Sequence, residues 1–178
     1  YWAWIKRVNV FHESLDFASL MSLNILFVVE NNSYSVYSHI DKRQSTNRSA
    51  VKLAKAHGIL AKKIDGNNII EIYRKSKKIL SHTKSPYLLE LKTFRVLEHC
   101  GPNNDDNLNY RKKKEIEFWL KKCPIENYKK HLLRNKIITD KKINHMKIKI
   151  NKEIMEAFEF AKKSSFPQKT SIMNYIYA

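Results

Sequence analysis

Short apolar runs in the first part of the chain predict three strands. Residues 24–30, NILFVVE, are almost continuously apolar and rich in β-branched side chains, as expected of a strand covered on both faces. Residues 60–65 and 85–94 form two further runs of strand length. The first of these two leads into the turn sequence DGN, in which we expect Gly66 to take a backbone angle that would strain other residues.

Apolar side chains recur at helical spacing in the segments that precede and separate these runs. We expect helices over residues 11–21, 49–59 and 68–82. Ser49 is a suitable N-cap for the second helix, and Gly58 is a suitable residue to end it. Residues 34–48 are polar without a period and predict a surface loop.

The alternation of strands and helices predicts an α/β fold. Strands joined by helices at this spacing form right-handed crossovers, which give a parallel sheet covered by helices. Ligands of such sheets bind outside the carboxyl ends of the strands. We call the residues expected there the carboxyl rim, which comprises Glu30–Tyr34, Asp65–Asn67 and Arg95–His99.

The second part of the chain is predicted to be helical. Residues 95–110 form a long, turn-rich segment, which in a compact domain indicates a functional loop or disorder. Helical stretches follow over residues 111–122, 125–135 and 139–163. Pro124 and Thr139 stand where helices begin, and we expect Phe118 and Trp119 to lie in the core of these helices.

These patterns divide the chain into an α/β domain, residues 10–110, and a C-terminal helical segment, residues 111–167. The ends, residues 1–9 and 168–178, are atypical. With 178 residues and 43% apolar content, the chain is long enough for one domain with a core.

The charge balance changes this picture little. The chain has 34 basic and 17 acidic residues, a net charge of +17, which by itself suggests a nucleic-acid or anionic partner. Lys, Asn and Ile together make up about a third of the chain, however, as a genome rich in A and T would produce. Because arginines are few and the lysines are scattered, we expect no nucleic-acid partner, and a basic nucleic-acid binder is kept as an alternative.

The cellular location is predicted from membrane, secretion and disulfide signals, none of which we find in the sequence. The longest apolar stretch, residues 25–29, is far too short to span a membrane, so we expect no membrane partner. The first residues, YWAWIKRVNVF, lack the features of a signal peptide. Cys100 and Cys123 are too few for a disulfide framework or a zinc site, which suits a reducing compartment. We predict a cytoplasmic chain.

The paired asparagines that follow the first strand suggest a metal site. Residues 28–38 read VVENNSYSVYS. An amide oxygen is a hard, neutral ligand suited to Mg²⁺, which prefers six oxygens and often shares them with substrate phosphates. The side chain of Asn32 and the backbone carbonyl of Tyr34 could supply two of them. The alternative is that the pair only forms a turn, a common use of asparagine.

A longer set of motifs adds context to this pair. The string VFHESLDFASLMSLNILFVVENNSYSVYS, followed by KLAKAHGI, IDGNNIIEIY, PYLLELKTFR and EAFEFAKKSSFP, resembles the alpha subunit of thiamine diphosphate-dependent 2-oxo acid dehydrogenases. The resemblance covers about residues 10–167 and only the C-terminal half of such subunits. It implies a partial three-layer α/β/α parallel sheet of the thiamine diphosphate-binding fold, followed by C-terminal helices.

The resemblance also implies a cofactor site. In this family Mg²⁺ holds the cofactor diphosphate and is bound by an Asp in a Gly-Asp-Gly turn, by an Asn and by a backbone carbonyl. The Asn matches Asn32 and the carbonyl matches Tyr34. The Gly-Asp-Gly turn should fall at residues 2–4, where this chain has Trp2-Ala3-Trp4 and therefore no carboxylate.

A histidine of the carboxyl rim has a match in the same family. The string TFRVLEH resembles the family's loop whose histidine contacts the phosphate side of the cofactor and assists acyl transfer. The match assigns a catalytic and cofactor-binding role to His99 and a cofactor-binding role to Arg95. Imidazole suits this task because its pKa lies near neutrality. The alternative is a loop histidine without a function.

The function implied is oxidative decarboxylation of a 2-oxo acid, such as pyruvate, with acyl transfer to lipoyllysine. The implied cofactors are thiamine diphosphate and Mg²⁺. The implied partners are a beta subunit, in an α₂β₂ assembly, and a lipoyl-bearing acyltransferase. The missing Gly-Asp-Gly turn supports an alternative, a catalytically dead remnant or subunit-pairing module.

Overall fold

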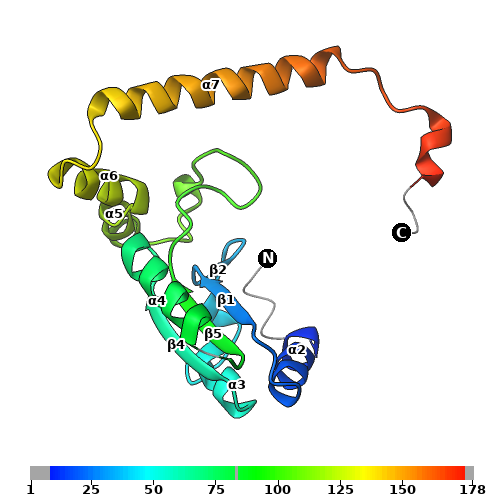
Figure 1. The fold of residues 1–178 in the computed structure, drawn as a ribbon, viewed down its shortest axis with the longest axis vertical. Helices are drawn as coiled ribbons and strands as arrows, with labels where there is room; N and C mark the ends of the chain where they lie inside the picture. Colours follow the sequence, from blue (N-terminus) through cyan, green and yellow to red (C-terminus); the bar gives the residue numbers. More distant parts are fainter. Residues whose placement is uncertain (1–8, 83, 175–178) are drawn as a thin grey trace. The chain divides into compact units, whose positions relative to one another are not determined.

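The computed structural model describes residues 9–82 and 84–174 (Figure 1). By its internal contacts the chain divides into two units, Tyr1–Tyr128 and Lys129–Ala178, which we describe separately. This division falls later than the predicted boundary between residues 110 and 111, which stays a prediction.

The first unit is built on a three-stranded parallel sheet. The strands are β1 (Leu26–Asn31), β4 (Leu60–Asp65) and β5 (Tyr87–Lys92), in the spatial order β1-β5-β4. The three strands begin and end level with one another, because Leu26 and Leu60 both pair with Tyr87, and Asn31 and Asp65 both pair with Lys92. Their carboxyl ends therefore form one edge, as the crossover argument predicts.

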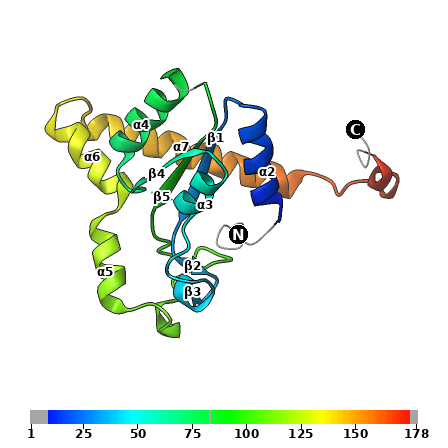
Figure 2. The same cartoon turned by 90° about the horizontal axis from the view of Figure 1, so that it is seen from below.

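Helices cover both faces of this sheet (Figures 1 and 2). They are α2 (Asn9–Leu20), α3 (Ala50–Ala56) and α4 (Ile69–His82). Phe11 and Leu15 of α2 and Ala54 of α3 pack in one core cluster with Leu88 of β5. Residues Ile72 and Ile79 of α4 pack against the opposite face, where Leu89 and Leu91 are buried. The fold class is therefore the predicted α/β class, a parallel sheet between layers of helices, with C-terminal helices after it.

The helix caps agree with the sequence. The Ser49 hydroxyl accepts a hydrogen bond from the backbone N–H of Lys52, 3.1 Å away, at the start of α3. Gly58, just beyond the end of α3, has a φ of +74°, a left-handed conformation that favours glycine. Near it, His57 contacts Asp16 and its Nε2 lies 3.0 Å from Nδ1 of His12, which joins the end of α3 to α2.

The loop prediction for residues 34–48 was wrong in part. The short strands β2 (Tyr34–Ser35) and β3 (Ser38–His39) pair as an antiparallel hairpin, and the 3₁₀ helix η1 (Ile40–Lys42) follows. Two-residue strands carry too few side chains for a period, so the sequence pattern could not reveal them.

Gly66 is required for a reason other than the predicted backbone angle. The left-handed conformation is absent there, but a Cβ atom at this position would lie 2.9 Å from the Lys92 carbonyl oxygen and 3.1 Å from the carbonyl carbon of Leu91. The backbone N–H of Gly66 donates to that Lys92 oxygen at 2.7 Å. A side chain is therefore excluded by the close approach of the turn after β4 to the end of β5.

Helices α5 (Lys113–Lys121) and α6 (Pro124–Arg134) follow the long loop. Trp119 is buried, 8% exposed, and its ring stacks on Phe94, as expected of a core residue. Phe118 is 52% exposed, so its predicted place in the core was wrong. Neighbouring residues on a helix point in different directions, and of these two it is Trp119 that packs against Phe94, after β5.

The second unit consists mainly of α7 (Asp140–Lys163) and the short η3 (Lys169–Met173). The Thr139 hydroxyl caps α7 by accepting from the backbone N–H of Lys142. Residue pairs one turn apart, such as Lys149 and Glu153 with 3.8 Å between charged atoms, support the helix from its own surface. In the described part of the chain, no helix has the length and apolar character needed to cross a membrane.

We predict that Gly66→Ala lowers the free energy of unfolding by about 1–3 kcal/mol, because the added methyl group overlaps backbone atoms of β5. Urea denaturation followed by circular dichroism measures this change. Gly101→Ala is the matched control, since a Cβ there meets only the side chain of Glu98, which can move. Equal losses for the two variants would contradict the packing argument.

Candidate functional site

The carboxyl rim gathers at one edge of the sheet, as predicted. Asn31, Asp65 and Lys92 end their strands at the same level. The backbone N–H of Thr93 continues the ladder by donating to the Asn31 carbonyl at 3.0 Å. The segments that follow the three strand ends are therefore neighbours in space.

The Asn32–Tyr34 turn has a defined geometry. The Asn32 Oδ1 accepts a hydrogen bond from the backbone N–H of Tyr34 at 2.9 Å. Between them, Ser33 has a φ of +67°, a conformation that costs energy in a residue other than glycine and needs support from its surroundings. The backbone N–H of Ile40 provides part of this support by donating to the Ser33 carbonyl at 2.8 Å.

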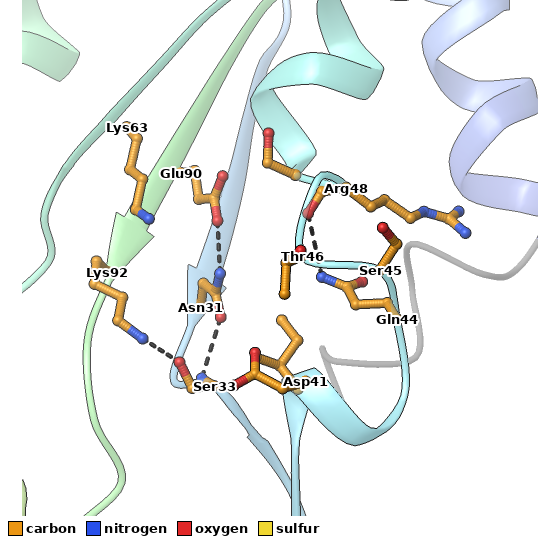
Figure 3. Close-up of a pocket in the computed structure, with 12 residues that line it drawn as sticks. Asn31, Ser33, Asp41, Gln44, Ser45, Thr46, Arg48, Lys63, Glu90 and Lys92 are labelled. Atoms are coloured by element: carbon orange, nitrogen blue, oxygen red, sulfur yellow. Dashed lines mark hydrogen bonds between the residues drawn. The ribbon is translucent and has the colours of Figure 1, made fainter.

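Further support comes from residues on the face of the sheet that α2 and α3 cover (Figure 3). Asn31 donates from Nδ2 to Glu90 Oε1 at 2.6 Å and accepts with its own Oδ1 from the Ser33 N–H at 3.1 Å. The Lys92 ammonium donates to the Ser33 hydroxyl. The side chains line a cavity of about 190 Å³ that also includes Lys63.

Tyr34 connects the turn to the rest of the rim. Its ring packs edge-on against Phe94 and Tyr110, with centroids 6.1 Å and 5.7 Å away. Its hydroxyl donates to Glu115 Oε2 at 2.7 Å. Burial, followed by the hydrogen bond to the Glu115 carboxylate, raises the pKa of Tyr34 well above its ordinary value of 10.0. The ring thus joins β2, the segment after β5 and α5 while its hydroxyl stays protonated.

The Arg95 guanidinium contacts two loops through one of its nitrogens, Nη2. Its Nη2 donates to the Val36 carbonyl at 2.8 Å and to the Tyr110 hydroxyl at 3.0 Å. Its Nη1 is buried and has no hydrogen-bond partner among residues 9–82 and 84–174. A buried guanidinium donor without a partner is suited to an anionic group such as a phosphate.

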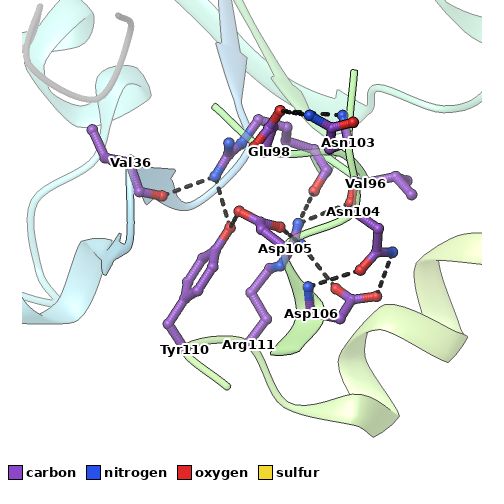
Figure 4. A network of polar contacts seen from close by, with 10 residues as sticks. Val36, Val96, Glu98, Asn103, Asn104, Asp105, Asp106, Tyr110 and Arg111 are labelled. Atoms are coloured by element: carbon purple, nitrogen blue, oxygen red, sulfur yellow. Dashed lines mark hydrogen bonds and ion pairs between the residues drawn. The ribbon is translucent and has the colours of Figure 1, made fainter. Parts of the chain in front are cut away.

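A buried ion pair organises the loop that carries His99 (Figure 4). Arg111 and Asp105 are only 5% and 4% exposed, and the guanidinium donates to the Asp105 carboxylate. It also donates to Asp106 at 2.9 Å and to the backbone carbonyl of Arg95 at 2.6 Å. Of the two alternatives for residues 95–110, these contacts favour a structured loop, because the Arg111 side chain joins its beginning to its end.

Tyr110 takes part in the same network. Its hydroxyl donates to Asp105 Oδ2 at 2.7 Å. Burial, followed by this hydrogen bond to a carboxylate, raises the pKa of Tyr110. Asp105 thus receives donors from Tyr110 and Arg111, which compensates its own burial.

The predicted magnesium ligands fit the metal only in part. Asn32 Oδ1 and the Tyr34 carbonyl are two neutral oxygens on one turn, and accepting the Tyr34 N–H leaves the amide oxygen a second lone pair. The position matched to the family's aspartate, Ala3, lies outside the described residues. Within the described residues, no cluster of three or more His, Cys, Asp or Glu side chains could hold a metal ion. The part of the site that the structure describes thus offers two oxygens and a nearby guanidinium, without a carboxylate cluster.

The structure brings together some of the predicted site residues. Asn32, Tyr34 and Arg95 lie on neighbouring segments, because Tyr34 packs against Phe94 and Arg95 binds the Val36 carbonyl. His99 is half-buried on the loop held by Arg111. Its role, and those of the other three, stay predictions.

Sequence reasoning missed the residues that support the site. Glu90 lies inside an apolar run and was assigned only to a strand, although a carboxylate in such a run signals a partner. Asp105 and Arg111 were also missed, although an acidic pair lies within the loop and an arginine directly follows it.

A parallel sheet covered by helices on both faces, with polar side chains at the carboxyl ends of its strands, defines the class, an α/β protein of the kind whose ligands bind at that edge. Comparison with known proteins gives the family. Residues 9–170 match the family described as Dehydrogenase E1 component. The chain belongs to this family, among the alpha subunits of 2-oxo acid dehydrogenases.

Individual relatives are similar over almost the whole chain. The chain is 26% identical to the mitochondrial 2-oxoisovalerate dehydrogenase subunit alpha 1 of Arabidopsis thaliana, over 94% of this chain and 36% of that protein. It is 27% identical to the pyruvate dehydrogenase E1 component subunit alpha of Rickettsia conorii, over 93% of this chain and 51% of that protein. It is 29% identical to the pyruvate dehydrogenase E1 component subunit alpha of Porphyra purpurea, over 94% of this chain and 48% of that protein. The chain thus spans between about a third and half of the length of these relatives.

Among solved structures, the chain has a partial likeness to transketolase from Campylobacter jejuni. The TM-score is 0.43 at 18% identity, over 50% of this chain and 14% of that one.

We predict that Asp105→Asn destabilises the first unit by about 3 kcal/mol or more, because it leaves the buried Arg111 charge without its closest partner. Asp106→Asn is the matched control, since the Asp106 side chain is 35% exposed and its pair with Arg111 should contribute about 1 kcal/mol or less. Urea denaturation measures both, and proteolysis between residues 97 and 104 reports on the loop. A larger loss for Asp106→Asn would contradict the assignment.

The raised pKa of Tyr34 predicts a stability change at high pH. Above pH 10 an unfolded tyrosine loses its proton while folded Tyr34 keeps it, so the free energy of unfolding falls as the pH rises. Tyr34→Phe should therefore show a shallower decline above pH 10 than the wild type in urea denaturation. Tyr73→Phe, at an exposed position of α4, should keep the wild-type slope. Parallel pH curves for all three proteins would be inconsistent with this prediction.

Proposed function

We propose that this chain forms the alpha-subunit side of a cofactor site in a thiamine diphosphate-dependent 2-oxo acid dehydrogenase. The reaction is oxidative decarboxylation of a pyruvate-like 2-oxo acid with acyl transfer to lipoyllysine. The observation that supports it best is the ordered Asn32–Tyr34 turn on the carboxyl edge of the sheet, together with Arg95, whose Nη1 has no hydrogen-bond partner in the part of the chain that the structure describes. The family uses thiamine diphosphate and Mg²⁺.

Each predicted site residue has a role in this proposal. Asn32 Oδ1 and the Tyr34 carbonyl would hold Mg²⁺ next to the diphosphate of the cofactor. Arg95 adds a donor toward the phosphates. His99 contacts the phosphate side of the site and donates a proton during acyl transfer. When bound, thiamine diphosphate supplies the carbanion stabilisation that decarboxylation needs.

The proposal requires other chains. A beta subunit completes the site in an α₂β₂ assembly, and a lipoyl-bearing acyltransferase receives the acyl group. Neither a nucleic acid nor a membrane is a partner. The proposed location is cytoplasmic, although one similar relative is mitochondrial.

A second candidate is a subunit-pairing module or catalytically dead remnant. It is favoured by Ala3, which replaces the family's metal-binding aspartate. Without that carboxylate, the chain offers Mg²⁺ one oxygen ligand fewer and no negatively charged side chain to attract the cation. This candidate keeps the fold and the beta-subunit partner but no turnover.

Mixing the chain with a beta subunit of the family separates the two candidates. The test measures complex formation by analytical ultracentrifugation and pyruvate decarboxylation in the presence of thiamine diphosphate and Mg²⁺. Turnover that falls in His99→Ala supports the enzyme. A stable complex without turnover supports the pairing module, and the absence of any complex would contradict both.

The chain alone should bind thiamine diphosphate weakly. We predict a dissociation constant of about 1 mM or weaker with Mg²⁺ present, equivalent to about −4 kcal/mol. The physical reason is the neutral donor set. Isothermal titration calorimetry measures it, and a dissociation constant of about 1 μM would show that Asn32 and Tyr34 suffice without the aspartate.

A further inference from the structure

A buried carboxylate lies in the middle of the sheet. Glu90 belongs to the central strand β5 and is only 1% exposed. Its neighbours along the strand, Leu89 and Leu91, are buried apolar residues on the opposite face. A buried carboxylate is costly unless hydrogen bonds and opposite charges compensate it, so its presence at this position calls for a physical reason.

The surroundings of Glu90 supply that compensation. Lys63 is its register partner on β4, and Lys92 lies two residues further along β5, so both side chains share its face of the sheet. All three line the same cavity of about 190 Å³ and extend toward the same space (Figure 3). Two lysines beside one glutamate give this face a local excess of positive charge.

The hydrogen bonds of Glu90 lead directly to the proposed metal site. Glu90 Oε1 accepts from Asn31 Nδ2 at 2.6 Å, and Asn31 Oδ1 accepts from the Ser33 N–H at 3.1 Å. Lys92 holds the Ser33 side chain, and Ile40 holds its carbonyl. The left-handed Ser33 is therefore fixed at its amide, its carbonyl and its hydroxyl.

The conformation of Ser33 decides where the neighbouring oxygens point. Ser33 connects Asn32 to Tyr34, and the hydrogen bond from the Tyr34 N–H to Asn32 Oδ1 closes the turn around it. If Asn31 rotates away, the Ser33 amide loses its acceptor and its positive φ loses one of three supports. Both proposed metal-binding oxygens then lose their fixed separation.

We propose that Glu90 is a positioning residue that acts through Asn31 to hold the Ser33 turn, and thereby orients Asn32 Oδ1 and the Tyr34 carbonyl toward a divalent cation. The link from Glu90 to the turn is independent of any ligand. The link from the turn to the cation rests on the proposed function.

Two substitutions distinguish the effect of the length of the Glu90 side chain from the effect of its charge. Glu90→Gln keeps the length and an acceptor oxygen, so Asn31 stays in place. Glu90→Asp keeps the charge but is one methylene shorter, so it no longer reaches an atom that lies 2.6 Å from the glutamate oxygen. Leu88 precedes Glu90 by two residues on β5, so its side chain lies on the same face of the sheet. Leu88→Ala is therefore the matched control for a general loss of packing.

Amide hydrogen exchange measured by nuclear magnetic resonance tests the first link. We expect Glu90→Asp to raise the exchange rates of the Ser33 and Ile40 amides by about tenfold relative to the amides of β5, the change expected from about one hydrogen bond. Glu90→Gln should restore these rates to within about threefold of the wild type. Leu88→Ala should accelerate the sheet amides without this selectivity. A selective effect of Leu88→Ala, or none of Glu90→Asp, would overturn the proposal.

Paramagnetic Mn²⁺ tests the second link, since it detects weak binding in place of Mg²⁺. We expect Mn²⁺ to broaden the Asn32 and Tyr34 amide signals in the wild type and in Glu90→Gln, and to broaden them less in Glu90→Asp. Equal broadening in Glu90→Asp, with its exchange rates raised, would overturn the positioning of the cation. Absence of broadening in the wild type would instead contradict the metal role in the proposed function, while the exchange result would stand by itself.

Discussion

The central strand β5 is the constraint on which the rest of the first unit depends. It pairs with β1 on one side and β4 on the other, in a register that ends all three strands level. Its alternating side chains serve both faces, since Leu88 belongs to one core cluster and Leu89 and Leu91 to the other. Because parallel strands cannot slip by one residue without turning their apolar side chains to the wrong face, this register also fixes the position of the carboxyl rim.

The buried polar side chains of the first unit are concentrated next to the carboxyl rim. Glu90 and Lys92 hold the Ser33 turn from the sheet, whereas Arg111 and Asp105 hold the loop after β5. Tyr34 lies between the two systems, against Phe94 and Tyr110. Buried polar groups of this kind add specificity to a local geometry at some cost in stability, because each depends on its partners. Their position indicates that the backbone geometry at this edge of the sheet is closely specified.

The fold itself was predictable to a large extent because local patterns and global topology agree. The strands at residues 60–65 and 24–30, the helices on either side and the Ser49 cap all follow from periodicity and capping chemistry. The hairpin at residues 34–39 was not predictable, because pairs of two residues have no period. The sequence identified Gly66 as a turn residue. It could not show that a side chain is excluded there, because the atoms that exclude it belong to β5, a strand later in the chain.

The sequence by itself determined the family, the α/β class and the place of Asn32, Tyr34, Arg95 and His99 beyond the strand ends, since motifs and strand length are local properties. Only the tertiary structure decided which side chains support them. Glu90 meets Asn31, and Arg111 meets the Arg95 carbonyl, across parallel strands and a long loop. Contacts between residues far apart in the chain arise when the sheet forms, and no spacing along the sequence encodes them.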